Sequence, residues 1–119
     1  MTLLINTTGP EARIAFVQEG EVLCECKWLA DRELSRKLLE EIDLLLEEAG
    51  IGKGDIKRIA VHQGPGHFGS LRTGVVVAGS LAYALGAELA AVTGKDWEEN
   101  IKEAEEAVAV EVVGARYEK

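Results

Sequence analysis

The segment of this 119-residue chain best suited to chemistry is a glycine-rich stretch, Gly64-Pro65-Gly66-His67-Phe68-Gly69-Ser70-Leu71-Arg72-Thr73-Gly74, here called the glycine turn. It follows a strand-like run, Ile56 to Gln63, and leads into a helix-like run, Leu71 to Leu85. Glycines let a backbone bend sharply and leave N–H groups free at a helix start, as in cradles for phosphate or carboxylate groups. The same composition also builds tight structural turns, so both interpretations stay open. The residues assigned to the turn are Gly64, Pro65, Gly66, Phe68, Gly69 and Arg72.

The spacing of Gly64, Gly66 and Gly69 satisfies the dinucleotide-binding pattern GxGxxG between a strand and a helix. A nucleotide- or phosphate-binding protein is therefore one hypothesis for function. The surroundings argue against a dinucleotide site, because only one further strand-helix-strand unit follows. The acid expected at the end of the next strand is missing, since Glu88 lies at its start and Asp96 beyond its end. A Walker loop is excluded because neither Lys-Ser nor Lys-Thr follows the glycines.

Other reactive side chains near the turn are few. His62 and His67 flank it without the further ligands that a metal requires, so both are interpreted as structural. Ser70 and Thr73 have no evident base nearby, and helix capping explains Ser70 better than nucleophilic attack does. Arg72 opposes the helix dipole, so we expect it to pair with a carboxylate of this chain or of a partner. The sequence predicts no catalytic residue, no metal site and no cofactor.

Composition bounds the class of protein. A 47% hydrophobic and 29% charged chain of this length predicts one globular domain spanning residues 1–119. The net charge of -8 argues against a strong direct grip on nucleic acid. No apolar run is long enough for a membrane span, and Thr2 to Ile5 is too short for a signal peptide. Together with reduced thiols at Cys24 and Cys26, these features predict a cytoplasmic protein.

Hydrophobic periodicity predicts an α/β fold with a mixed sheet of five to six strands flanked by helices. The first half reads as an antiparallel meander, in which Val22, Cys24, Cys26 and Trp28 share one face of the third strand. The strands of this meander are Thr2 to Thr7, Arg13 to Gln18 and Glu21 to Leu29. A helix is predicted next, with Asp31 as its N-cap, Glu33 in its first turn and Gly50 as its C-cap. The predicted elements that follow are a strand from Ile56 to Gln63, a helix from Leu71 to Leu85, a strand from Leu89 to Thr93, a helix from Asp96 to Glu106 and a strand within Ala107 to Val113.

The first two predicted helices carry more apolar or small residues than one sheet face requires. In the first helix, Leu39, Leu44 and Leu46 widen the apolar stripe, so a second side could pack against a partner or against a third layer of this chain. In the second helix, small residues four positions apart allow another backbone to approach closely. The residues predicted to form a partner interface are Leu34, Leu38, Ile42, Leu45, Gly74, Ala78 and Ala82.

The glycine turn and the helix after it resemble the TsaB (YeaZ-type) family, which carries a GPGSFTGLRIG-like turn and then a helix of the GLAxALG kind. The matching residues are Gly64, Pro65, Gly66, Phe68, Leu71, Arg72, Gly74, Leu81, Ala82, Ala84, Leu85 and Gly86, and the departures in the turn are His67, Gly69, Ser70 and Thr73. Upstream, Leu4 to Thr8 resembles the family's ILAIDTS strand, with Asn6 in place of Asp. The HSE-like start of the family's first helix is replaced by Leu34-Ser35-Arg36, and the resemblance covers residues 2 to 93.

This resemblance implies one lobe of the actin/Hsp70-like (ribonuclease-H-like) fold, without the second lobe that members usually carry. It implies a noncatalytic subunit in the threonylcarbamoyladenosine modification of tRNA. Its partner would be a TsaD-like catalytic subunit, which holds the metal and nucleotide and pairs through a bundle of the first two helices of each chain. The same surface can serve self-pairing, so we expect a homodimer when the chain is alone. Asn6 lacks the negative charge that a hard cation needs, which argues against ATP hydrolysis by this chain. A peptidase is a third hypothesis, without support from any HxxxH zinc spacing.

Overall fold

The computed structural model describes residues 1–66, 68–111 and 113–114, with only the backbone of Phe68. The predicted α/β fold and mixed sheet are confirmed. The elements are β1 (Thr2–Asn6), β2 (Glu11–Gln18), β3 (Glu21–Leu29), α1 (Leu34–Ala49), a short 3-10 turn (Lys53–Asp55), β4 (Arg58–His62), α2 (Phe68–Leu85), β5 (Glu88–Val92), α3 (Trp97–Ala104) and β6 (Ala109–Val110).

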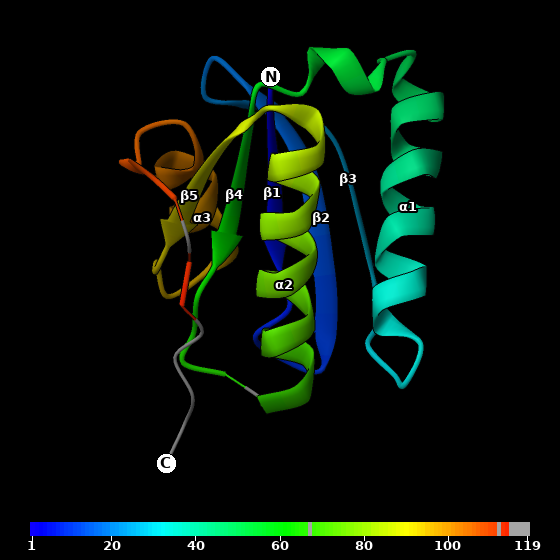
Figure 1. Cartoon of the computed structure of the whole chain (residues 1–119), viewed down its shortest axis with the longest axis vertical. Coiled ribbons are helices and arrows are strands. Elements are labelled where there is room, and N and C mark those ends of the chain that lie inside the picture. Colours follow the sequence, from blue (N-terminus) through cyan, green and yellow to red (C-terminus); the bar gives the residue numbers. More distant parts are fainter. Residues whose placement is uncertain (67, 112, 115–119) are drawn as a thin grey trace.

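The strands form one sheet in the order β3-β2-β1-β4-β5-β6 (Figure 1). β1, β2 and β3 form the predicted antiparallel meander, whereas β1 pairs in parallel with β4, and β4 pairs in parallel with β5. Parallel neighbours need a crossover connection, which α1 supplies between β3 and β4 and α2 supplies between β4 and β5. The parallel strands therefore end at the same edge of the sheet, beside the glycine turn.

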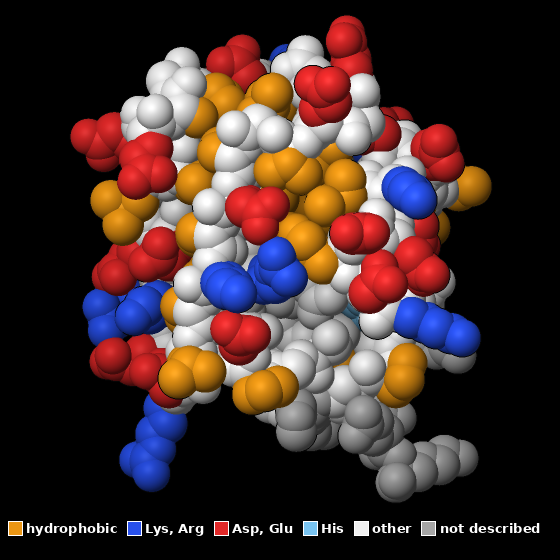
Figure 2. All heavy atoms as spheres, turned by 180° about the vertical axis from the view of Figure 1, so that it is seen from behind, with side chains coloured by type: hydrophobic (Ala, Val, Ile, Leu, Met, Phe, Trp, Pro, Cys, Tyr) orange, Lys and Arg blue, Asp and Glu red, His pale blue; other side chains and the backbone are white. Residues whose placement is uncertain are grey.

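Helices cover the sheet on both faces because side chains alternate along each strand. On one face, Leu3 and Phe16 pack with Leu38 of α1 and Ala78 of α2 in the larger core cluster. On the other face, Leu4 packs in a smaller cluster that includes Ala104 of α3 and Val92 of β5. The molecule thus has three layers, and Figure 2 shows the side away from α1 and α2, where hydrophobic side chains lie among acidic and basic ones.

The alternation predicted for β3 is wrong at Val22. The pairing of β2 with β3 shifts register between Phe16 and Val17, so that Phe16 faces Cys24 while Val17 faces Val22. One extra residue on β3 is accommodated there as a β-bulge, which changes the face on which the preceding side chain lies. Val22 consequently packs against the smaller cluster, whereas Cys24, Cys26 and Trp28 pack against the larger one.

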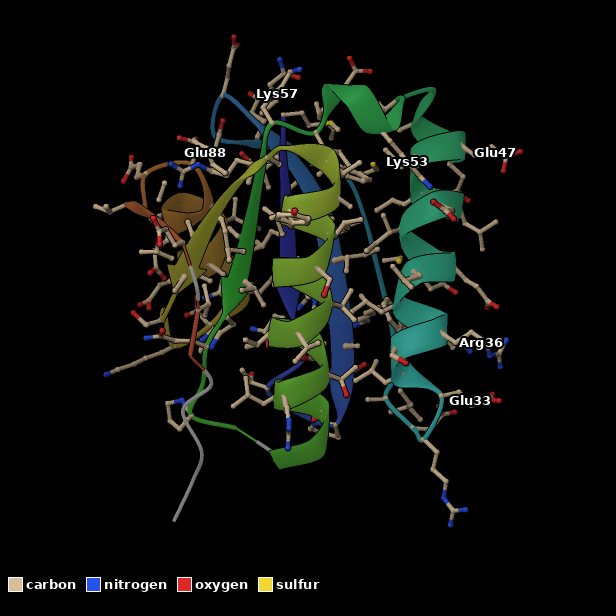
Figure 3. The ribbon with its side chains drawn as sticks, in the orientation of Figure 1. Glu33, Arg36, Glu47, Lys53, Lys57 and Glu88 are labelled. Atoms are coloured by element: carbon tan, nitrogen blue, oxygen red, sulfur yellow. The ribbon has the colours of Figure 1, made fainter. Side chains whose placement is uncertain are left out.

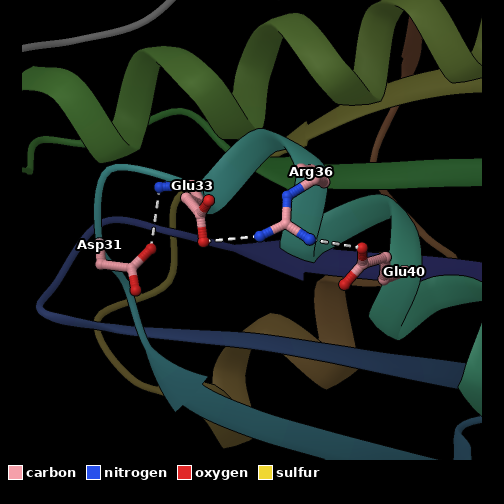
Figure 4. Close-up of polar contacts among 4 residues, drawn as sticks. All are labelled: Asp31, Glu33, Arg36 and Glu40. Carbon is pink, nitrogen blue, oxygen red and sulfur yellow. Dashed lines mark hydrogen bonds and ion pairs between the residues drawn. The ribbon is translucent and has the colours of Figure 1, made fainter.

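The first helix ends as predicted, whereas its start, shown in Figure 4, differs from the prediction. Gly50 is the C-cap in the left-handed conformation, with φ of 67°. Asp31, the predicted N-cap, instead accepts a hydrogen bond from the Glu33 backbone N–H at 2.9 Å in the turn before the helix. The N-cap position belongs to Glu33, whose carboxylate pairs with Arg36 at 2.6 Å, and Arg36 also pairs with Glu40 at 2.8 Å. These exposed ion pairs occupy the charged side of α1.

The second half of the chain differs from prediction at its boundaries. α2 begins at Phe68 rather than Leu71, so most of the glycine turn already belongs to the helix. β6 covers only Ala109–Val110 of the strand expected within 107–113, and residue 112 lies outside the described residues. Among the described residues, none of the helices has the length and apolar character needed to cross a bilayer.

Candidate functional site

The glycine turn packs against the loop that follows β1. Gly64 has a φ of 102°, a conformation that L side chains rarely adopt, and its N–H donates to His62 Nδ1 at 3.0 Å. Gly66 is needed for a different reason. A Cβ at this position would lie 2.5 Å from the Thr8 carbonyl oxygen and 2.8 Å from Thr8 Cα, both backbone atoms. Close approach to the β1–β2 loop, rather than a positive φ, therefore requires glycine at 66.

Gly69 and Gly74 contrast with each other inside α2. A Cβ at Gly69 would meet nothing within 4 Å, whereas a Cβ at Gly74 would overlap the Thr7 hydroxyl. That hydroxyl donates to the Ser70 carbonyl oxygen at 2.8 Å, which ties the β1–β2 loop to the first turn of α2. Arg72 is exposed, and its predicted pairing with a carboxylate stays a prediction. His67 and the side chain of Phe68 lie outside the described residues.

A network of amide and imidazole groups fills the sheet edge where β1 and β4 end. Asn6 Nδ2 donates to Asn100 Oδ1 at 2.9 Å, and Asn100 Nδ2 donates to the Gly94 carbonyl oxygen at 3.1 Å. His62 Nδ1 accepts from Gly64, so His62 Nε2 carries the hydrogen that is shared with the same Gly94 oxygen at 2.9 Å. His62 is thus a satisfied structural histidine, as predicted. Asn100 was not identified from the sequence, because its partner Asn6 lies 94 residues away.

Carboxylates of α3 take up the free backbone N–H groups of the neighbouring β5–α3 loop. Glu103 accepts from Gly94 at 2.6 Å and from Thr93 at 3.1 Å, and Glu99 accepts from Lys95 at 2.7 Å. Backbone N–H groups at this edge of a parallel sheet commonly bind phosphate groups, but here internal acids already occupy them. No group of three or more His, Cys, Asp or Glu suited to a metal ion occurs in the described part of the chain.

A cavity of about 510 Å³ lies where the glycine turn approaches the start of α1. Its lining includes Gly69 and Ser70 of α2 together with Asp31 and Arg32 from the β3–α1 loop. Asp31 and Arg32 bring charges of opposite sign, so the lining offers no net positive charge to a phosphate group. The lining is mixed polar and apolar, and its charges do not select an anion.

The residues predicted to form the partner interface lie in the interior of this chain. All seven are buried against its own sheet or loops, so close packing on α2 serves internal contacts such as that of Gly74 with Thr7. Burial within the isolated chain leaves little of these side chains exposed, and their contact with a partner stays a prediction. The residues concerned are Leu34, Leu38, Ile42, Leu45, Gly74, Ala78 and Ala82.

The exposed apolar residues of α1 and α2 are different ones. Leu39 is 46% exposed and Val76 is 57% exposed, and both line a groove of about 360 Å³ between the two helices, here called the α1–α2 groove. It continues into a second hollow that shares Leu39 and Leu81 and includes the ion pair between Asp43 and Lys53. The widened stripe at Leu39 was the only signal for this surface in the sequence. The groove is lined by Leu39, Val76, Val77, Ser80, Leu81 and Ala84.

The two cysteines are half-buried free thiols on the face of β3 that α1 covers. Burial, together with the Glu41 carboxylate 3.7 Å from the sulfur, raises the pKa of Cys26 to about 12. Burial also raises the pKa of Cys24. A thiol in this state is protonated near neutral pH and is a poor nucleophile. The reduced state expected from the sequence agrees with this arrangement.

Comparison with known proteins assigns this chain to a family. The family model for TsaD, described as tRNA N6-adenosine threonylcarbamoyltransferase, matches residues 28–105. The chain belongs to this family. The matched stretch includes α1, the glycine turn and α2, and it ends just beyond α3.

Curated relatives share a short but similar segment with this chain. The tRNA N6-adenosine threonylcarbamoyltransferase of Geotalea uraniireducens is 47% identical over 62 residues, which is 49% of this chain and 18% of that protein. The enzyme of the same name from Ralstonia pickettii is 42% identical over 64 residues, which is 54% of this chain and 18% of that protein. The chain therefore matches less than a fifth of the length of either relative.

Solved structures give the fold more completely. YeaZ from Pseudomonas aeruginosa superposes with a TM-score of 0.70 and 29% identity, covering 77% of this chain and 43% of that one. A second structure, described as an uncharacterized protein with similarity to the peptidase YeaZ from Pseudomonas aeruginosa, gives the same TM-score and identity and is covered over 42% of its length. The resemblance to TsaB and the single actin-like lobe are both confirmed. This chain spans less than half of either structure.

Proposed function

We propose that this chain is a noncatalytic subunit that supports a TsaD-like enzyme in the threonylcarbamoyladenosine modification of tRNA. Membership of the TsaD family and structural similarity to YeaZ support a role in this system. In this proposal residues 1–119 act in the cytoplasm as one lobe, and the chain pairs with itself when the enzyme is absent. Two regions of the structure support the proposal, an exposed apolar groove between α1 and α2 and a sheet edge whose polar groups are bonded within the chain.

The observation that carries the proposal is the exposed α1–α2 groove. Leu39 and Val76 leave apolar surface in solvent beside Leu81, on helices whose inner residues pack in the core. Exposed apolar grooves between helices are typical sites for helices of another protein. The charged residues Glu33, Arg36 and Glu47 point away from α2 (Figure 3), so they leave the groove open to an apolar partner.

The noncatalytic part of the proposal is supported by the filled sheet edge. Asn6 is an amide that already donates to Asn100, while its Oδ1 accepts from the Thr8 backbone N–H at 2.9 Å and the Thr8 hydroxyl at 2.7 Å. Such a side chain has neither the charge nor the free lone pairs to hold a hard cation. Glu99 and Glu103 occupy the N–H groups that could otherwise bind a phosphate.

The second candidate function is binding of a nucleotide or phosphate at the glycine turn. The 510 Å³ cavity beside Gly69 and Ser70 favours it. Against it, Gly66 and Gly74 are accounted for by contacts with Thr8 and Thr7, and Asp31 adds a negative charge to the cavity. A thermal-shift measurement with ATP, ADP and NAD distinguishes the two functions, because only this second one predicts stabilisation by those ligands.

The partner hypothesis is tested by titrating the chain into a TsaD-like protein from the same source. We expect a complex in light scattering, and we expect Leu39→Glu to weaken it roughly tenfold or more by placing a charge in the groove. Leu44→Glu is the matched control, since Leu44 is 53% exposed on the same helix but does not line the groove. Equal effects of the two substitutions, or no complex with the unmodified chain, would contradict the proposal.

A further inference from the structure

A second groove lies on the other flank of α2, between this helix and the edge of the sheet. It has a volume of about 500 Å³ and is here called the α2–β6 groove. Its floor is apolar, and Tyr83 at its rim is 92% exposed. The residues that line it are Gly79, Ala82, Tyr83, Ala87, Glu88, Leu89, Ala109, Val110 and Glu111.

The two grooves lie on opposite flanks of α2. Ser80, Leu81 and Ala84 face the α1–α2 groove, while Ala82 and Tyr83 of the same two turns line the α2–β6 groove. Figure 1 shows α2 standing in front of the sheet with α1 on one side and β5 on the other. A helix with its side chains is about 10 Å wide, which is also the usual spacing between packed elements. One partner can therefore occupy both grooves at once with two adjacent segments.

Charge distinguishes the α2–β6 groove from its neighbour. In the hollow that extends the α1–α2 groove, Asp43 is paired with Lys53, so the charges there balance. The charged residues lining the α2–β6 groove are both acidic, Glu88 and Glu111. Glu88 lies on the opposite flank of α2 from Lys53 (Figure 3), and among the residues that the structure describes its one ion pair is a 3.5 Å contact with Arg58. An apolar floor with an acidic rim fits an apolar segment flanked by Lys or Arg. A second copy of this chain, with a net charge of -8, is the poorer occupant.

We propose that the TsaD-like partner straddles α2, placing one segment in the α1–α2 groove and an apolar segment flanked by basic residues in the α2–β6 groove. This inference rests on the proposed function and extends its interface to the sheet edge. Tyr83 and Val110 supply the apolar contact, and Glu88 and Glu111 face the basic flanks. The partner thereby contacts β6 as well as α1 and α2.

The test uses two matched pairs of variants in the same titration. Val110 is 43% exposed and lines the groove, whereas Val108 is 81% exposed and does not. We expect Val110→Glu to weaken partner binding roughly tenfold and Val108→Glu to change it less than about twofold. Glu111→Lys should weaken binding and reduce its dependence on salt, whereas Glu106→Lys, exposed after α3 and outside the groove, should not. Circular dichroism melts check that each variant folds.

The possible outcomes distinguish a failure of this inference from a failure of the proposed function. If Leu39→Glu weakens the complex and Val110→Glu does not, the partner stays on the helix pair and the inference is overturned while the proposed function stands. If the unmodified chain binds no TsaD-like protein, both are overturned. If Val110→Glu abolishes only self-association, the occupant is a second copy of this chain and the inference is again overturned.

Discussion

The glycine turn and the outer side of α1 and α2 differ in how many of their side chains and polar groups are in contact with the rest of the chain. At the turn, Gly66 and Gly74 are in contact with Thr8 and Thr7, and at the adjoining sheet edge Asn6 Nδ2 and Oδ1 both form hydrogen bonds within the chain. On the helix pair, Val76 and Tyr83 are mostly exposed and Leu39 is nearly half exposed. The more conspicuous sequence motif thus serves internal packing, while the surface open to a partner is formed by residues that the motif does not mark.

Gly66→Ala is expected to cause the largest loss of stability. The added Cβ meets backbone atoms of Thr8, which cannot move without shifting the β1–β2 loop. We expect the free energy of unfolding to fall by about 3 kcal/mol in urea titrations. Gly69→Ala is the control, because a Cβ there meets nothing within 4 Å, and it should change stability little. A stable Gly66→Ala protein that has lost binding of a phosphate-bearing ligand would instead show that the turn is a cradle.

A somewhat smaller effect is expected from Gly74→Ala. Its Cβ would overlap the hydroxyl of Thr7, a fully buried side chain that donates to Ser70. We expect a loss of about 2 kcal/mol, because this β-branched side chain has little freedom to move aside. Gly79→Ala in the same helix meets open space and should stabilise the protein by about 0.5–1 kcal/mol through helix propensity. Similar melting temperatures for the two variants would show that α2 does not depend on the contact with Thr7.

Asn6→Asp tests whether the sheet edge is structural. The carboxylate cannot donate to Asn100 Oδ1 and would place two acceptor oxygens together. We expect a loss of about 1–2 kcal/mol in stability, since an unmatched polar pair remains partly buried. We also expect no ATP turnover by either protein. ATP hydrolysis by the Asn6→Asp protein that survives repurification, with none by the unmodified chain, would contradict the structural interpretation of this edge.

The smallest effect concerns the thiols of β3. Because the pKa of Cys26 is raised from 9.0 to about 12, its modification by a thiol reagent should be slow at pH 8 and accelerate as the pH approaches 12. The raised pKa favours the protonated thiol in the folded state. This contribution to stability is therefore complete below about pH 9 and is lost as the pH rises through the folded pKa. Labelling of Cys26 in the folded chain as fast as in the urea-unfolded chain at pH 8 would refute this.

Local patterns predicted most of the fold. The alternation of Ile14 and Phe16 with their neighbours marked β2, and Gly50 marked the end of α1. The bulge opposite Val17 was not predictable, because an inserted residue leaves the hydrophobic alternation of β3 intact. Nor could the pairing of Asn6 with Asn100 be predicted, since it depends on how α3 crosses the sheet.

The surface that we propose for the partner lies on the two helices indicated by the sequence, but on other residues than those predicted. The apolar excess on α1 correctly identified a helix with more hydrophobic surface than one sheet face requires. Which leucines face outward depends on the angle between α1 and the sheet, and this angle buries Leu38 and exposes Leu39. The small residues of α2 indicated close packing, and the neighbour they approach proved to be the chain's own sheet and β1–β2 loop.

The central claim is that α1 and α2, rather than the glycine turn, bind the partner. Amide hydrogen exchange of the chain, measured with and without a TsaD-like protein, tests it most directly. We predict slower exchange in residues 76–84 of α2 and in the part of α1 around Leu39, with no change at residues 64–66. Protection confined to the glycine turn, with unchanged exchange in α1 and α2, would contradict the account.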